Sequence, residues 1–150
     1  MSEKLIARNR KARYEYHLED IFDAGLVLKG SEVKALRQGK ASINEAYCTV
    51  EGGEVWLKDA HIGHYDKSSR FNLPEKRPRK LLLNSREIKK LIGAVSRKGY
   101  TITPLRLYFN ERGYAKLEIA LARGKKVYDK REDIKRRDIE RETRREYKIR

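Results

Sequence analysis

The sequence is 150 residues long, and its 37 Lys or Arg residues against 22 Asp or Glu residues give a formal net charge of +15. This length suits one compact domain with an appended segment, and the charge indicates an anionic partner, with nucleic acid favoured over an anionic membrane surface. The chain has no apolar run of the roughly 18 residues that a membrane span needs, and its single cysteine excludes an internal disulfide. Since the N-terminal stretch also lacks the apolar region of a secretory signal, we expect a cytoplasmic protein with no membrane partner.

The first part of the chain is predicted to form mainly β-strands. Tyr14, Tyr16 and Leu18 alternate with polar residues, which is the period of a half-buried strand. The segment 25–30 is short, apolar and bounded by glycines, so it predicts a second strand.

A short helix and a hairpin follow. Residues 31–39 predict the helix, with Ser31 as its capping residue. Residues 45–62 predict the hairpin, because Gly52 and Gly53 can supply the positive φ angles of a tight turn.

The next segments complete a predicted barrel. Residues 66–80 contain two prolines and no periodicity, so they predict a long basic loop. Residues 85–99 have the apolar spacing of an amphipathic helix, and residues 100–109 and 114–122 predict a second hairpin. Strands interrupted by one or two helices favour a mainly β, OB-fold-like small barrel with flanking helices over residues 1–122, with an α+β sandwich as the alternative.

The C-terminal segment, residues 123–150, is a basic tail with 13 Lys or Arg and 7 Asp or Glu residues, a net charge of +6. Its apolar residues fall on no common helical face, so the tail has no surface with which to dock on the barrel. We therefore expect it to be disordered when free and to become helical against a polyanion that neutralises its arginines. A solvated tail that only keeps the protein soluble is the alternative.

No group of residues in the sequence makes a positive case for catalysis. His61 and His64 are three apart on a predicted strand and so point to opposite faces, which argues against a metal site. The sequence lacks the glycine-rich loop that cradles phosphates, and Cys48 has the pattern of a buried strand residue. We therefore expect a protein that is not an enzyme and needs no cofactor or metal.

Nucleic-acid binding has better support. Nine tyrosines are interleaved with basic residues, which offers stacking faces beside phosphate contacts. Most of them suit strand packing, whereas Tyr65 and Tyr128 belong to no predicted core element. Residues 9–13 and 77–80 form two basic patches that could contact RNA, although solvated charge explains them equally well.

Five segments together carry a more specific signal. In chain order they are NRKARYEYHLED, DAGLVLKGSEVKALRQGKASI, RPRKLLLNSREIKKL, KGYTITPLRLYF and ARGKKVYDKRED. Their order and spacing resemble the small protein B family, the bacterial SsrA-binding proteins. The resemblance spans about Asn9 to about Lys135. It implies an OB-fold barrel with a tail that is unstructured in solution.

The resemblance also implies a function. A member of this family binds the tRNA-like domain of transfer-messenger RNA and delivers it to stalled ribosomes for trans-translation. Its tail enters the empty decoding site and mRNA channel of the small subunit. We expect a monomer with these two partners. A general ribosomal or OB-type RNA-binding protein is the first alternative, and an RNA-processing enzyme is the second.

The matching motifs imply which residues act. On the body they are Asn9, Arg13, Asp23, Glu32, Lys34, Arg37 and Leu83. In the tail they are Lys125, Lys126, Tyr128, Asp129, Lys130 and Arg131. Asp23 stands where glutamate is expected, which keeps the charge but shortens the reach. Tyr128 stands where many relatives have histidine, and tyrosine can stack on a base but cannot become a cation.

Two of these positions have alternative interpretations. Glu32, near the start of the predicted helix, either complements the helix dipole or accepts a hydrogen bond from a base edge or a 2′-OH. Leu83 either joins the core or is the one of three consecutive leucines that faces away and packs against RNA.

Overall fold

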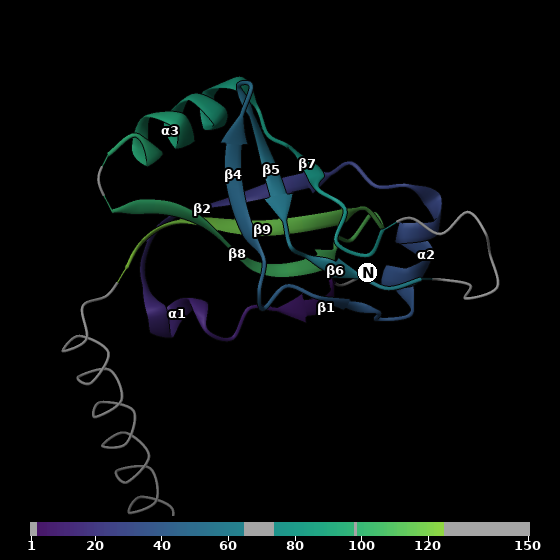
Figure 1. Cartoon of the computed structure of the whole chain (residues 1–150). Helices are drawn as coiled ribbons and strands as arrows, with labels where there is room; N and C mark the ends of the chain where they lie inside the picture. The colour runs from purple at the N-terminus through teal and green to yellow at the C-terminus, as the bar shows by residue number, and fades with distance from the viewer. Residues whose placement is uncertain (1–2, 65–73, 98, 125–150) are drawn as a thin grey trace, which may run out of the picture.

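A computed structural model of the protein describes residues 3–64, 74–97 and 99–124 (Figure 1). Strands dominate these ranges, and short helices lie at the periphery of the sheet. In chain order the elements are β1 (Lys4–Arg8), α1 (Ala12–Glu15), β2 (Tyr16–Leu26), α2 (Gly30–Arg37), β3 (Ala41–Ser42), β4 (Tyr47–Glu51), β5 (Glu54–Lys58), β6 (His61–Ile62), β7 (Arg79–Leu82), α3 (Ser85–Val95), β8 (Tyr100–Phe109) and β9 (Ala115–Gly124).

The main sheet closes on itself to form a small barrel. Its strands follow the order β1-β8-β4-β5-β7-β2-β9, and β8 also pairs with β9, so the sheet joins back on itself. The pairings are antiparallel, as in β4 with β5 and β8 with β9. β3 and β6 form a separate two-stranded sheet. The predicted mainly β barrel with flanking helices is confirmed, and the closed sheet argues against the α+β sandwich.

Both predicted hairpins are confirmed, and their turns use the expected residues. Gly52 and Gly53 have φ angles of +58° and +76° between β4 and β5, a region that other residues rarely adopt. Between β8 and β9, Gly113 has a φ angle of +83°, and Asn110 Oδ1 accepts two backbone N–H groups of the turn.

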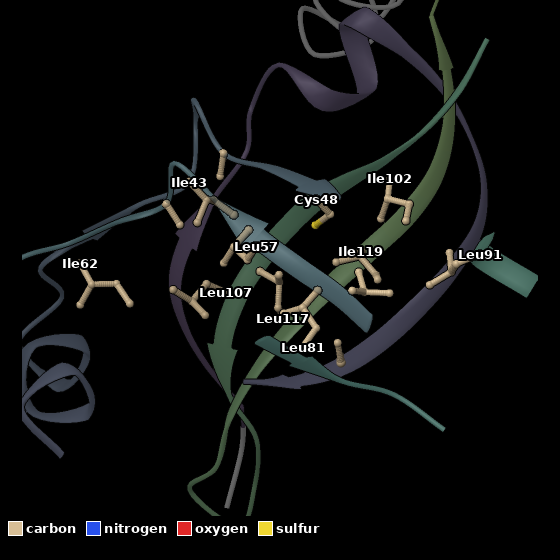
Figure 2. Close-up of a cluster of buried hydrophobic side chains, with 14 of the residues drawn as sticks. Ile43, Cys48, Leu57, Ile62, Leu81, Leu91, Ile102, Leu107, Leu117 and Ile119 are labelled. Carbon is tan, nitrogen blue, oxygen red and sulfur yellow. The ribbon is translucent and has the colours of Figure 1, made fainter. Parts of the chain in front are cut away.

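Aliphatic side chains fill the barrel (Figure 2). The fully buried residues include Leu57, Leu81, Ile102, Leu107, Leu117 and Ile119. Leu91 of α3 joins the same cluster, as its amphipathic pattern predicted, and Asn84 caps this helix by accepting the Glu87 N–H at 2.8 Å. Cys48 is buried in the cluster as well. Burial raises the pKa of its thiol, so the group stays protonated.

The N-terminal third differs from the prediction in several places. Tyr14 lies in the short helix α1, so the strand predicted from Tyr14 begins only at Tyr16. The predicted strand over 25–30 is not separate, because β2 runs on to Leu26. Helix α2 was predicted at the right place, but Lys29 and not Ser31 is its N-cap. Local periodicity missed α1 because a tertiary contact, the burial of Ala12 against β8 and β9, holds this turn in place.

Two boundaries also need correction. The basic loop predicted over 66–80 ends earlier, since Arg79 and Lys80 belong to β7. Strand β9 continues to Gly124, two residues beyond the predicted end of the barrel at 122, and pairs there with the start of β2. Most of the predicted tail, from residue 125 onward, lies outside the described residues. Within the part of the chain described, no helix is long and apolar enough to cross a membrane.

Candidate nucleic-acid interface

Asn9 and Arg13, two of the predicted RNA contacts, line one hollow at the surface, which we call the Asn9 hollow. It has a volume of about 410 Å³ and lies where the end of β1 meets α1, β8 and β9. Its lining residues are Arg8, Asn9, Arg10, Ala12, Arg13, Leu105, Arg106 and Glu118. Four of these eight residues are arginines, so the hollow suits an anionic ligand.

Asn9 is fixed in this hollow by the backbone of β8. Its N–H donates to the Leu105 carbonyl at 2.8 Å, and its side-chain Nδ2 donates to the Pro104 carbonyl at 3.0 Å. The pairing of β8 with β9 shifts register between Pro104 and Arg106, which turns these carbonyls toward Asn9. Asn9 Oδ1 is buried and accepts no hydrogen bond from the described residues. A buried acceptor normally has a partner, so this oxygen is a candidate to accept one from a bound ligand.

The arginines beside Asn9 are open to solvent. Arg8 and Arg10 flank it, and Arg13 projects from α1, which is anchored by the buried Ala12. None of these three arginines forms an ion pair with another described residue. Their guanidinium groups therefore remain available for phosphate oxygens, which they can bind in bidentate fashion.

A chain of contacts connects the hollow with Asp23 on β2. Arg106, at the hollow, bonds Glu118 at 2.9 Å and lies 4.1 Å from the centre of the Tyr108 ring. The Tyr108 hydroxyl donates to Asp23 Oδ1 at 2.7 Å. Burial and the Asp23 carboxylate both raise the pKa of Tyr108, so this hydroxyl keeps its proton and holds the carboxylate in place. Asp23 itself is exposed.

Glu32 has a different setting, because it is buried in a network with two arginines. Its side chain is only 5% exposed, and that of Arg79 only 1%. Arg79 donates to Glu32 Oε2 through Nε at 2.9 Å and Nη2 at 2.6 Å, while Arg77 Nη2 donates to Oε1 at 2.5 Å. Arg79 also donates to the carbonyls of Ala60 and Glu75. The network ties α2 to β7 and to the segment before it.

The hydrogen bonds of this network keep the Glu32 carboxylate ionised although it is buried. Burial opposes its ionisation, but hydrogen bonds from Arg77, from the Lys29 backbone N–H and from Arg79 outweigh burial and lower the pKa of Glu32. The Lys29 bond, 3.0 Å long, forms one half of a helix capping box, in which the Glu32 carboxylate accepts the backbone N–H of the N-cap residue. Glu32 lies in the first turn of α2, which is the position that the helix-dipole interpretation requires. Its carboxylate is buried and paired in the free protein, and its contact with a base edge or a 2′-OH stays a prediction.

The basic patch predicted over 77–80 is wrong in part for the same reason. Arg79 is buried and paired, so it offers no free charge to a ligand. Lys80 forms a surface ion pair with Glu54 at 3.5 Å. The sequence predicted that residues 77–80 form one exposed patch, but in β7 the Arg79 side chain points inward and pairs with Glu32.

The remaining predicted body contacts lie away from the Asn9 hollow. Lys34 and Arg37 are exposed in the last turn of α2, and Figure 1 shows α2 at the opposite end of the molecule from α1. Leu83 is half-buried and packs against the core, whereas its neighbour Leu82 is 52% exposed. The leucine that faces away is thus Leu82 and not Leu83. The structure gathers Asn9, Arg13 and, through Tyr108, Asp23, but not the whole predicted set.

His61 and His64 both lie near the carboxylate of Glu75. His61 Nε2 lies 2.5 Å from Glu75 Oε2, and His64 Nδ1 lies 3.8 Å from Glu75 Oε1. No group of three or more His, Cys, Asp or Glu side chains in residues 3–64, 74–97 and 99–124 is arranged to hold a metal ion.

Several predicted residues lie outside the described part of the chain. They are the stacking candidate Tyr65 and the tail residues Lys125, Lys126, Tyr128, Asp129, Lys130 and Arg131. Conversely, the sequence reasoning missed Arg8 and Arg106 as lining residues. Arg106 interrupts the apolar run of β8, and that interruption was the signal that could have identified it.

Comparisons with known proteins agree with this picture. The family model described as SmpB protein matches residues 6–149. SsrA-binding proteins of Bradyrhizobium diazoefficiens and Afipia carboxidovorans are 56% and 55% identical over 139 residues, covering 93% of this chain and 88% of each relative. That of Sphingopyxis alaskensis is 55% identical over 142 residues, covering 95% of this chain and 88% of its own.

A solved structure extends the likeness to three dimensions. One chain from work described as "tmRNA-SmpB: a journey to the center of the bacterial ribosome" is 47% identical, with a TM-score of 0.67. The match covers 80% of this chain and 84% of the solved one. Sequence and structure thus agree over most of the molecule, and the chain belongs to the SmpB family of SsrA-binding proteins.

Proposed function

We propose that the protein binds the tRNA-like domain of transfer-messenger RNA and delivers it to stalled ribosomes for trans-translation. The observation that carries this proposal is the SmpB match over residues 6–149, which includes both the Asn9 hollow and the tail. The 47% identical structure comes from work on tmRNA and SmpB in the bacterial ribosome, which supports the same two partners here.

In this proposal the barrel, residues 1–122 together with the last two residues of β9, holds the RNA. Asn9, Arg13 and Asp23 are its contacts near the Asn9 hollow, and Lys34, Arg37 and the Leu82–Leu83 pair supply further contacts. Glu32 acts indirectly, by fixing α2. The exposed arginines neutralise phosphates, so affinity falls as salt rises.

The tail, predicted over residues 123–150 and taken here from residue 125 because β9 ends at Gly124, serves the ribosome. Its matching residues Lys125, Lys126, Tyr128, Asp129, Lys130 and Arg131 contact the decoding site and the mRNA channel of the small subunit. The protein itself makes and breaks no covalent bond, so its contribution is binding and placement. This role puts it in the cytoplasm, where bacterial ribosomes work.

Truncation tests whether the barrel and the tail have separate functions. A chain that ends at Gly124 keeps the whole of β9, so it should bind a tRNA-like fragment of transfer-messenger RNA with nearly full affinity. The same chain should fail to support tagging of nascent chains on stalled ribosomes. Loss of RNA binding on truncation would contradict the proposal. Equal affinity of the full chain for an unrelated RNA hairpin of the same length would favour a general RNA-binding protein.

A further inference from the structure

A second hollow adjoins the Asn9 hollow. It lies between β1 and β3, has a volume of about 410 Å³, and is lined by Leu5, Ile6, Ala7, Arg8, Arg10, Ala41, Ser42, Ile43 and Asn44. We call it the β1–β3 groove. Arg8 and Arg10 line both hollows, so the two are neighbours at the end of β1.

The chemistry of the β1–β3 groove suits a nucleic-acid backbone. No lining residue is acidic, and Arg8 and Arg10 form no ion pair with another described residue. Ser42 and Asn44 are exposed, and neither side chain hydrogen-bonds to another described residue. A hydroxyl and an amide can donate to a phosphate and also accept from a 2′-OH, while Leu5, 46% exposed, offers an apolar face to a ribose.

We propose that the β1–β3 groove binds the sugar-phosphate backbone of transfer-messenger RNA, next to the nucleotides at the Asn9 hollow. This inference rests on the proposed function. Arg8, Ser42 and Asn44 are not among the contacts that the family resemblance implied. Arg8 and Arg10 line both hollows, so an RNA strand that runs from Asn9 to Ser42 and Asn44 lies beside two guanidinium groups that form no ion pair with another described residue.

RNA fits this groove better than an acidic protein segment. The groove continues the surface on which RNA is already expected, and a strand of regularly spaced phosphates can place one in each hollow. A carboxylate-rich peptide would pair with the arginines, but it has no hydroxyl comparable to the 2′-OH for Ser42 and Asn44.

The test uses the full-length protein and a tRNA-like fragment of transfer-messenger RNA. The variants are Arg8→Gln, Asn44→Ala and the two combined, with Arg86→Gln on α3 as a charge-matched control at a distant, exposed site. Loss of the phosphate contact of Arg8 should weaken binding about five- to eightfold at ~0.1 M salt and reduce the slope of log K against log salt by about 0.7–0.9. Asn44→Ala removes no charge, so it should weaken binding without changing the slope. The combined variant should show the largest loss, and Arg86→Gln should bind like the parent protein. Thermal unfolding confirms that the variants fold.

Each outcome decides between the proposals. If the parent protein does not bind the fragment, the proposed function is wrong, and the groove assignment that rests on it is wrong as well. If the parent binds and the groove variants bind equally well, the function stands and the groove assignment is wrong. If the groove variants lose affinity only for the ribosome, the groove binds ribosomal RNA, and our assignment of transfer-messenger RNA to it is wrong. Equal displacement of the RNA from the groove by polyglutamate, followed through amide NMR shifts at Ser42 and Asn44, would indicate an acidic protein partner and also overturn it.

Discussion

The arginine side chains at the two ends of the barrel have opposite environments. Around the Asn9 hollow, Arg8, Arg10 and Arg13 are exposed and form no ion pair with other described residues. Beside α2, Arg79 is buried, and each of its three guanidinium nitrogens donates to Glu32 or to a backbone carbonyl. Both groups come from short basic runs that look alike in the sequence. Pairing and burial, and not the number of basic residues, therefore decide which charges can meet RNA.

The strongest test of this contrast is Arg79→Met. The substitution removes the buried cation but keeps much of its volume, and it leaves Glu32 buried with one partner fewer. Breaking a buried pair in this way should lower the free energy of unfolding by about 3–5 kcal/mol, measured by urea denaturation. The double variant Glu32→Gln/Arg79→Met should recover part of the loss, because no buried carboxylate is left short of a cation. A loss below about 1 kcal/mol would show that the network contributes little.

Arg13→Ala is the matching change at the open end. Because Arg13 is exposed and forms no ion pair with a described residue, the free energy of unfolding should change by no more than about 0.5 kcal/mol. Affinity for the tRNA-like fragment should fall about five- to eightfold at ~0.1 M salt, as measured by a filter-binding titration. Arg13→Lys should retain most of the affinity that depends on charge alone. A loss of stability comparable with that of Arg79→Met would remove the contrast between the two ends.

Tyr108→Phe tests the connection between the Asn9 hollow and Asp23. The change deletes the hydroxyl that donates to Asp23 but keeps the ring beneath Arg106. The free energy of unfolding should fall by about 0.5–1.5 kcal/mol, and RNA affinity should fall as Asp23 loses its fixed position. Tyr114→Phe is the control, since Tyr114 is 66% exposed on the surface. Equal effects of the two substitutions would mean that Asp23 needs no such support.

The smallest expected effect concerns acid. The pKa of Glu32 is lowered in the folded state, so its contribution to stability is present above the ordinary value of about 4.5 and is lost as pH falls through the folded pKa. Stability should therefore decline below about pH 4.5, and Glu32→Gln should show a shallower decline. Urea midpoints between pH 7 and pH 3 provide the measurement. Identical slopes for both proteins would show that other carboxylates control the acid response.

The sequence predicted the parts of the fold that depend on local chemistry. The glycine turn between β4 and β5, the Asn110–Gly113 turn and the capped, amphipathic α3 needed only neighbours a few residues apart. The prediction from the sequence failed where contacts between residues far apart in the chain determine the local structure. Helix α1 depends on the burial of Ala12 against β8 and β9, and the inward direction of Arg79 depends on Glu32, 47 positions earlier.

The candidate site shows the same division. Motif resemblance identified Asn9 and Arg13, which share a hollow, and Asp23, which reaches it through Tyr108. It could not show that Glu32 is covered or that Leu82, not Leu83, is the exposed leucine. Arg8 could not be assigned to the site from the sequence, because it reaches the hollow through the register of β1 on β8, which pairs it with Arg106.

The contacts of Arg79 also bear on how this chain can change length. Arg79 bonds the carbonyls of Ala60 and Glu75, and the Ile62 N–H donates to the Glu75 carbonyl at 3.0 Å. The two ends of the connection between β6 and β7 are therefore fastened together at its base. Doubling the length of a connection whose ends are held together in general costs only about 0.6 kcal/mol, so insertions between β6 and β7 should leave the barrel unchanged. Evolution, or an engineer adding an epitope, can vary this segment without disturbing the Asn9 hollow.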